Sequence, residues 1–161
     1  MKKSKTLPVT QAALIAALYV ALTFVTSSFG LASGPIQLRL SEALTILPYF
    51  TPAAVPGLFV GCILANIVSQ CALWDIIFGS IATLIGAIFT RILRKHKFLA
   101  PVPPIIANVL IVPFVIANVY GSQYSIPFLM LTVGIGEILS CGVLGMVLLT
   151  ALNKHKERIF K

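Results

Sequence analysis

The sequence predicts an all-α integral membrane protein, a compact bundle of six transmembrane helices with both termini in the cytoplasm. Composition is the first reason: of 161 residues, 58% are hydrophobic and only 10% are charged, which leaves too little polar surface to cover a soluble domain. Charge distribution is the second reason, because all but one of the 12 basic residues fall into three short clusters between apolar segments. The clusters are Lys2, Lys3 and Lys5; Arg91, Arg94, Lys95 and Lys97; and Lys154, Lys156, Arg158 and Lys161.

These clusters determine the expected topology. Basic residues flanking transmembrane helices remain on the cytoplasmic side, so the chain should cross the membrane an even number of times between consecutive clusters. At roughly 20 residues per crossing, residues 7–90 hold about four spans and residues 99–152 about two. We therefore expect one domain over residues 1–161 in a multi-pass protein of the plasma membrane. The formal charge of +8 follows from this topology and does not indicate a nucleic acid partner.

Each expected helix follows from an apolar run and its flanking residues. The run over residues 7–29 is too long for the core of a signal peptide and predicts the first helix. A short outer loop follows at residues 30–35, and the second helix, at residues 37–50, stops at the prolines of residues 51–57. The remaining helices are expected at residues 58–72, 76–92, 103–119 and 126–152.

The first expected helix carries small residues at helical spacing. Ala13, Ala17 and Ala21 recur every fourth position, and Ala12 and Ala16 lie beside them. Small side chains let another helix approach closely, which is the usual basis of helix association in lipid. The spacing alone fits two interpretations, packing within the bundle and docking of a partner protein.

Two acidic residues fall where an apolar environment is expected. Arg39 and Glu42 are three positions apart, so they share one face of a helix and can pair or line a protected cavity. Glu137 comes eleven residues into the last helix, a depth of roughly 16 Å at 1.5 Å per residue. An acidic side chain near the bilayer midplane costs about 2.5–3.5 kcal/mol, so it must face a polar interior or a partner.

Together the polar residues predict a pocket that opens to the outside and takes a ligand with hydrogen-bond donors. The candidate binding residues are Arg39, Glu42, Tyr49, Trp74, Asp75, Asn108, Asn118 and Glu137. A purely structural interpretation stays open, in which Arg39 pairs with Glu42, Asp75 caps a helix, and the two asparagines join helices.

The sequence contains few signals for other chemistry. A nucleotide-binding loop of the G-x-x-x-x-G-K-[ST] type is missing from it. Cys62, Cys71 and Cys141 lack C-x-x-C spacing, and no run of His, Cys and acidic residues has metal-ligand spacing, so we expect neither a metal nor a cofactor. The cysteines are interpreted as small buried residues.

Three runs of residues resemble the QueT family. The first, from Arg39 to Cys62, reads RLSEALTILPYFTPAAVPGLFVGC; the others are WDIIFGS from Trp74 and GIGE from Gly134. Members of this family are substrate-binding subunits (S components) of energy-coupling factor (ECF) importers for queuosine precursors. The resemblance implies no enzymatic activity, transport by toppling, and docking onto a transmembrane coupling subunit (T component) that carries two ATPases. It also implies that the alanines of the first helix form the docking face.

The implied substrates are 7-deazaguanines, whose N–H and amino groups lie side by side. A carboxylate accepts such a pair, which suits Glu137 or Glu42, while Asn108 suits the carbonyl edge. Trp74, Tyr49 or Phe50 could stack on the ring. Two alternatives stay open: an S component for a different small vitamin-like molecule, and a small membrane enzyme or assembly factor that uses Glu42 and Glu137 as acid and base.

Overall fold

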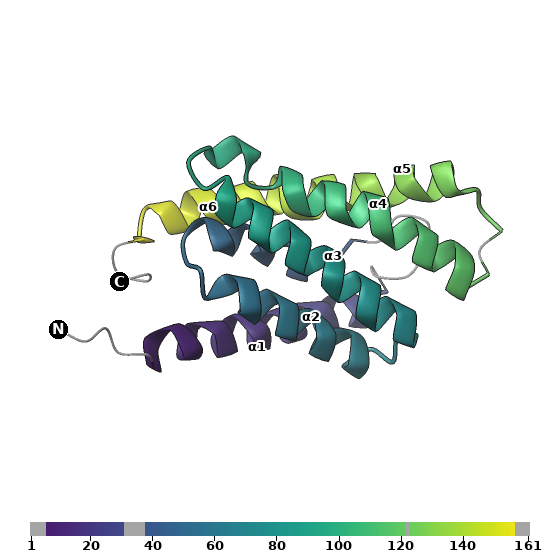
Figure 1. The fold of residues 1–161 in the computed structure, drawn as a ribbon, viewed down its shortest axis with the longest axis horizontal. Helices are drawn as coiled ribbons and strands as arrows, with labels where there is room; N and C mark the ends of the chain where they lie inside the picture. Colours follow the sequence, from purple (N-terminus) through teal and green to yellow (C-terminus); the bar gives the residue numbers. More distant parts are fainter. Residues whose placement is uncertain (1–5, 31–37, 122, 157–161) are drawn as a thin grey trace.

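Helices make up all the regular structure of the described residues (Figure 1). The computed structural model describes residues 6–30, 38–121 and 123–156. In chain order the elements are α1 (Thr6–Ser28), η1 (Leu40–Tyr49), α2 (Ala54–Val68), α3 (Leu73–Ile92), η2 (Lys97–Leu99), α4 (Val102–Val119), α5 (Ile126–Glu137), η3 (Ile138–Leu144) and α6 (Gly145–Asn153). The last three form one continuous helix of 28 residues.

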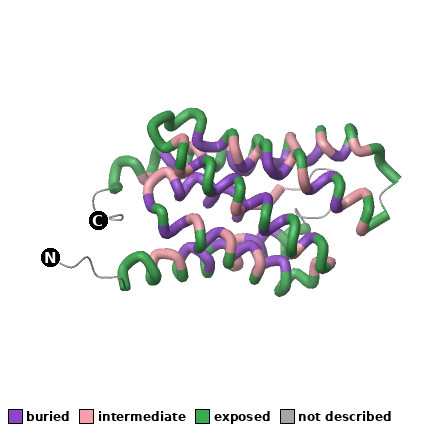
Figure 2. The backbone as a smooth tube through the Cα atoms, in the orientation of Figure 1, coloured by how far each residue is buried: buried purple, intermediate pink, exposed green. Residues whose placement is uncertain are grey.

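Four helices are long and apolar enough to cross a membrane, namely Thr6–Ser28, Leu73–Ile92, Lys97–Val119 and Ile126–Asn153. The helix Ala54–Val68 is apolar but shorter. Large hydrophobic side chains are exposed around the bundle, as lipid-facing residues are; Phe24, Leu110 and Leu131 are 62%, 54% and 61% exposed. Figure 2 shows that buried residues face the interior between the helices. These features confirm the expected all-helical membrane architecture, while the side on which the termini lie stays a prediction.

The second segment, expected as a helix over residues 37–50, is a helix of the tighter 3-10 type. Gln37 lies outside the described residues, and η1 runs from Leu40 to Tyr49 with every side chain from Ser41 to Pro48 buried. It packs against α1, α2, α3, α6 and η3, so it is enclosed by the bundle. Because a 3-10 helix rises about 2.0 Å per residue against 1.5 Å in an α-helix, ten residues reach roughly 20 Å through the interior.

Two further boundaries differ from the expectation. The helix α2 begins at Ala54 and includes Pro56 in its first turn, where a missing N–H costs nothing. The helix α3 begins at Leu73, with Ala72 at the N-cap position. Asp75 therefore lies inside the first turn and is not the cap. An acidic side chain in the first turn still interacts favourably with the positive end of the helix dipole.

The helices α1 and α2 pack closely through glycines. A Cβ atom built on Gly57 would lie 2.7 Å from the carbonyl oxygen of Ala12, and one on Gly61 would lie 3.0 Å from the Cα atom of Ala16. Glycines four residues apart give the small-residue contact on which membrane helices associate. Ala12 and Ala16 therefore pack against α2 within the protein.

The other three alanines of α1 face away from the bundle. Ala13, Ala17 and Ala21 are exposed, whereas Ala16 is only 7% exposed. The structure therefore divides the predicted docking residues into two sets on different faces of one helix. The set Ala13, Ala17 and Ala21 is accessible to a partner.

The described ends of the helices next to the basic clusters lie together. In Figure 1 the start of α1, the connection from α3 to α4, and the end of α6 are all at the left end of the bundle. This arrangement agrees with an even number of crossings between clusters. Lys2, Lys3, Lys5, Arg158 and Lys161 lie outside the described residues.

Candidate functional site

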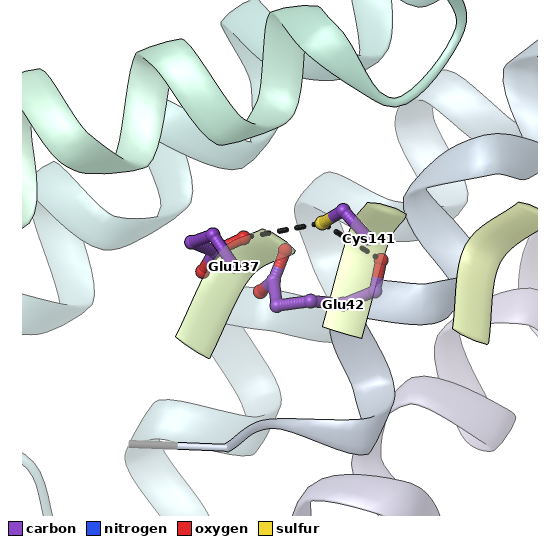
Figure 3. A group of neighbouring side chains, drawn as sticks. All are labelled: Glu42, Glu137 and Cys141. Carbon is purple, nitrogen blue, oxygen red and sulfur yellow. Dashed lines mark hydrogen bonds between the residues drawn. The ribbon is translucent and has the colours of Figure 1, made fainter. Parts of the chain in front are cut away.

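Buried polar side chains from five segments meet in the middle of the bundle. Tyr19 comes from α1, Glu42 from η1, Asn108 from α4, Glu137 from the end of α5, and Cys141 from η3. Glu42, Asn108 and Glu137 are 2%, 4% and 8% exposed. Figure 3 shows Glu137 and Cys141, on neighbouring turns of the last helix, facing Glu42.

Both carboxylate oxygens of Glu42 have hydrogen-bond donors. The hydroxyl of Tyr19 donates to Oε1, and Nδ2 of Asn108 donates to Oε2 at 3.5 Å. The backbone carbonyl of Glu42 accepts from Oγ1 of Thr45 at 2.6 Å and from Sγ of Cys141 at 3.4 Å. Glu42 is thereby tied to α1, α4 and the last helix, so it holds these segments together.

The carboxylate of Glu137 receives weaker hydrogen bonds than that of Glu42. Its hydrogen bond within the described residues comes from Sγ of Cys141, 3.1 Å from Oε2, and a thiol is a weak donor. The amide of Asn108 lies between the two acids: it donates to Oε2 of Glu42 at 3.5 Å and is also within hydrogen-bonding reach of Glu137. Oε1 of Glu137 therefore keeps its acceptor capacity for a ligand.

The segment that carries Cys141 is a π-helix, Ile138–Leu144, within the longer helix. Such wider turns are rare and occur frequently at functional sites. Here the wide turn begins directly after Glu137, and both Glu137 and Cys141 are buried. The irregular turn thus lies beside the two carboxylates.

A small cavity separates these groups. It measures about 20 Å³ and is lined by Arg39, Glu42, Gly79, Thr83, Asn108, Val112, Val133 and Glu137. That volume is close to what a single water molecule needs. The cavity is polar on the side of the acids and apolar at Val112 and Val133, as suits a flat molecule with a polar edge.

Arg39 lines this cavity without a salt bridge to any described residue. Its backbone N–H donates to Oγ of Ser140 at 3.3 Å, and its side chain is only partly buried. The expected alternative of a direct Arg39–Glu42 pair is therefore not what the structure contains. Two carboxylates and one guanidinium border the same space, which leaves the guanidinium available to a ligand's acceptor atoms.

Asp75 lies just beyond the cavity wall. Its Oδ2 accepts a hydrogen bond from the hydroxyl of Tyr120 at 2.8 Å, and that hydroxyl oxygen accepts from the backbone N–H of Ala72 at 3.2 Å. A Cβ atom on Gly79, which does line the cavity, would lie 3.9 Å from Oδ1 of Asp75. Asp75 thus joins the ends of α3 and α4 behind the site.

Three other predicted binding residues lie outside this cavity. Trp74, 55% exposed and stacked on Phe78, lines an open groove of about 650 Å³ between α3 and α4 together with Asn118. Nδ2 of Asn118 donates to the carbonyl oxygen of Phe114 at 2.7 Å. Tyr49 lies at the far end of η1, where its carbonyl accepts a hydrogen bond from the side chain of Arg91. The structure does not bring these three residues to the cavity.

Sequence reasoning missed two hydrogen-bond partners of the acids, Tyr19 and Cys141, and four residues that line the cavity, Gly79, Thr83, Val112 and Val133. The sequence does single out Tyr19, because it is the one tyrosine in the apolar first helix. Cys141 was interpreted only as a small buried residue, yet its sulfur and the carboxylates of Glu42 and Glu137 offer ligand atoms within 4.8 Å of one another. Metal-ligand spacing along the chain could not show this group, because Glu42 and Glu137 are 95 positions apart.

The fold and the cavity define a helical membrane protein with an internal polar site. Residues 9–154 match the family model described as "QueT transporter", and the chain belongs to this family. It is therefore a multi-pass membrane protein of a transporter family and not an enzyme.

A curated relative is "Queuosine precursor transporter QueT" of Lactococcus lactis subsp. cremoris (strain MG1363). The two sequences are 38% identical over 86 residues, which cover 53% of this chain and 50% of the relative. The matched part thus spans about half the length of that protein. No solved structure matches the chain.

Proposed function

We propose that this protein is the S component of an ECF-type importer and captures a queuosine precursor, a 7-deazaguanine base, from outside the cell. The observation that carries the proposal is the buried cavity in which Glu137, Glu42 and Asn108 face one another in a chain of the QueT transporter family. Acidic and amide groups in an enclosed site match the donor and acceptor edges of such a base. The name of the lactococcal relative supports the same substrate class.

The two carboxylates have different roles in this proposal. Glu137 accepts the ring N–H and the amino group, because a thiol is its donor and one oxygen has spare capacity. Glu42, held by Tyr19 and Asn108, maintains the shape of the site. Arg39 or Asn108 donates to the carbonyl edge of the base. A cationic substituent, where the precursor carries one, is attracted by the second carboxylate.

Binding requires the cavity to expand. A space of about 20 Å³ holds roughly one water molecule, far less than a bicyclic base needs. Arg39 is the partly buried polar residue of the wall, and it lies directly before η1. We propose that Arg39 and the start of η1 move outward when the ligand binds, so that the ligand selects a more open conformation.

Transport then depends on partners that supply ATP hydrolysis. We propose that Ala13, Ala17 and Ala21 dock onto the coupling subunit with its two ATPases, since this face of α1 is exposed and lined by small side chains. The toppled protein then releases the base on the cytoplasmic side.

Direct binding tests the proposed function. Calorimetry of the detergent-purified protein with 7-aminomethyl-7-deazaguanine and 7-cyano-7-deazaguanine should give saturable heat at one ligand per chain. Guanine is the matched control, because it carries the same donor edge without the substituted pyrrole ring. Absence of binding by both deazaguanines, with binding of an unrelated vitamin-like molecule, would assign the site to a different substrate.

The proposed orientation is tested by thiol labelling in intact cells. In a Cys71→Ser background, a cysteine replacing Gln123 should react with an impermeant maleimide, whereas one replacing Lys95 should react only after lysis. Gln123 and Lys95 are both exposed and lie in loops at opposite ends of α4. Labelling of Lys95→Cys in intact cells would reverse the orientation. Ser33 and Ser122, the other loop positions suited to this test, lie outside the described residues.

A further inference from the structure

A second groove runs between the ends of α3 and α4 that carry the central basic cluster. It measures about 440 Å³, and every lining side chain is apolar. Phe89 on α3 and Leu93, which directly follows that helix, form one wall, while Val102 and Ile106 form the wall on α4. Ile106 is 52% exposed, so the groove opens to the outside of the bundle, where lipid surrounds the protein. It shares none of its lining with the substrate cavity.

The connection that closes one end of this groove is strongly basic. Residues 94–101 join Leu93 to Val102, and these two residues stand on opposite walls. The connection therefore lies across the end of the groove. Its Arg94, Lys95 and Lys97 are all exposed.

No acidic residue within residues 94–101 offsets these three basic side chains. The chain has four acidic residues, of which Glu42, Asp75 and Glu137 are buried and Glu157 follows α6. Phe98 is 72% exposed, and Nζ of Lys97 lies 4.7 Å from the centre of its ring. A basic segment with an exposed aromatic side chain is typical of contact with the boundary between headgroups and acyl chains.

We propose that this groove binds an anionic phospholipid, with one acyl chain along α3 and α4 and the phosphate on Arg94, Lys95 and Lys97. The apolar walls suit a hydrocarbon chain, and the basic connection places positive charge where the headgroup of that lipid must lie. Phe98 inserts beside it at the headgroup boundary. Positive charge near an anionic membrane surface strengthens binding by about fivefold per basic residue. The lipid thereby fixes the depth at which this end of the bundle lies in the membrane.

Lipid binding to matched charge variants tests the proposal. Native mass spectrometry of the purified full chain is titrated with phosphatidylglycerol and with phosphatidylcholine of the same acyl chains. The wild type should bind the first phosphatidylglycerol at least about fivefold more tightly. Arg94→Gln with Lys95→Gln, which leaves Lys97 in place, should reduce this preference at least about fivefold. The control pair Lys154→Gln with Lys156→Gln removes the same charge from the end of α6 and should change the preference less than twofold.

A third variant tests the groove itself. Ile106→Trp fills part of the space and should weaken binding of both lipids, while Ile135→Trp, an exposed position on α5, should not. Circular dichroism confirms that each variant keeps its helix content. Three results would overturn the proposal. They are an equal loss of lipid preference in the two pairs of charge variants, no preference of the wild type for phosphatidylglycerol, and unchanged lipid binding by Ile106→Trp. Loss of co-purifying coupling subunit with unchanged lipid binding would assign the surface to a protein partner. None of these results depends on the identity of the transported substrate.

Discussion

Glu137→Gln should weaken binding of a 7-deazaguanine at least about tenfold. The substitution keeps the side-chain size but replaces one acceptor oxygen with an amide donor, which then opposes a donor of the ligand. Mismatched polar groups in a buried site cost about 1–3 kcal/mol, and more where charge is involved. Each 1.4 kcal/mol corresponds to a factor of ten in affinity. Calorimetry on the detergent-purified variant measures the change.

Glu42→Gln is the matched control, because it is the same substitution in the other carboxylate of the cavity. Here the new amide must meet donors already in place, the hydroxyl of Tyr19 and the amide of Asn108. We expect the empty protein to lose stability, seen as a lower thermal midpoint in detergent. Glu137→Gln should keep or raise that midpoint, since it replaces a buried ionisable group with a neutral one of the same size. Unchanged affinity in both variants would falsify recognition by carboxylates.

Ala17→Leu should abolish uptake into cells while leaving ligand affinity in detergent nearly unchanged. The side chain at residue 17 is exposed on α1, between Ala13 and Ala21, so a larger one holds the coupling subunit away without disturbing the bundle. Association is measured by co-purification of the coupling subunit, and affinity by calorimetry on the same preparation. Equal losses of association and of ligand affinity would show that residue 17 serves internal packing instead.

Ala16→Leu provides the contrast one residue away. Ala16 is 7% exposed, and its Cα atom would lie 3.0 Å from a Cβ atom on Gly61. Added methylene groups in such a tight contact typically cost about 1–3 kcal/mol. We therefore expect Ala16→Leu to lower the thermal midpoint and the yield of folded protein, which Ala17→Leu should not do. Similar unfolding of both variants would contradict the division of α1 into an inner and an outer face.

Helix order was predictable from the sequence because it depends on local composition. Apolar runs of membrane length and three basic clusters are visible without any tertiary information, and the helices of the structure follow the predicted order. The conformation of η1 was not predictable in this way. The eight residues from Ser41 to Pro48 are all buried, so no exposed polar face reveals the period of η1, and 3-10 and α geometry look the same in the sequence.

The sequence by itself determined that Glu42, Asn108 and Glu137 need a protected interior, because polar groups in an apolar segment must find partners. Tertiary structure decided which partners they find. It joins Tyr19 and Cys141 to the two acids and leaves Trp74 and Asn118 on an outer groove. It also divides the alanines of α1 between an inner and an outer face. These outcomes depend on the rotation of each helix about its axis, which is set by packing against its neighbours.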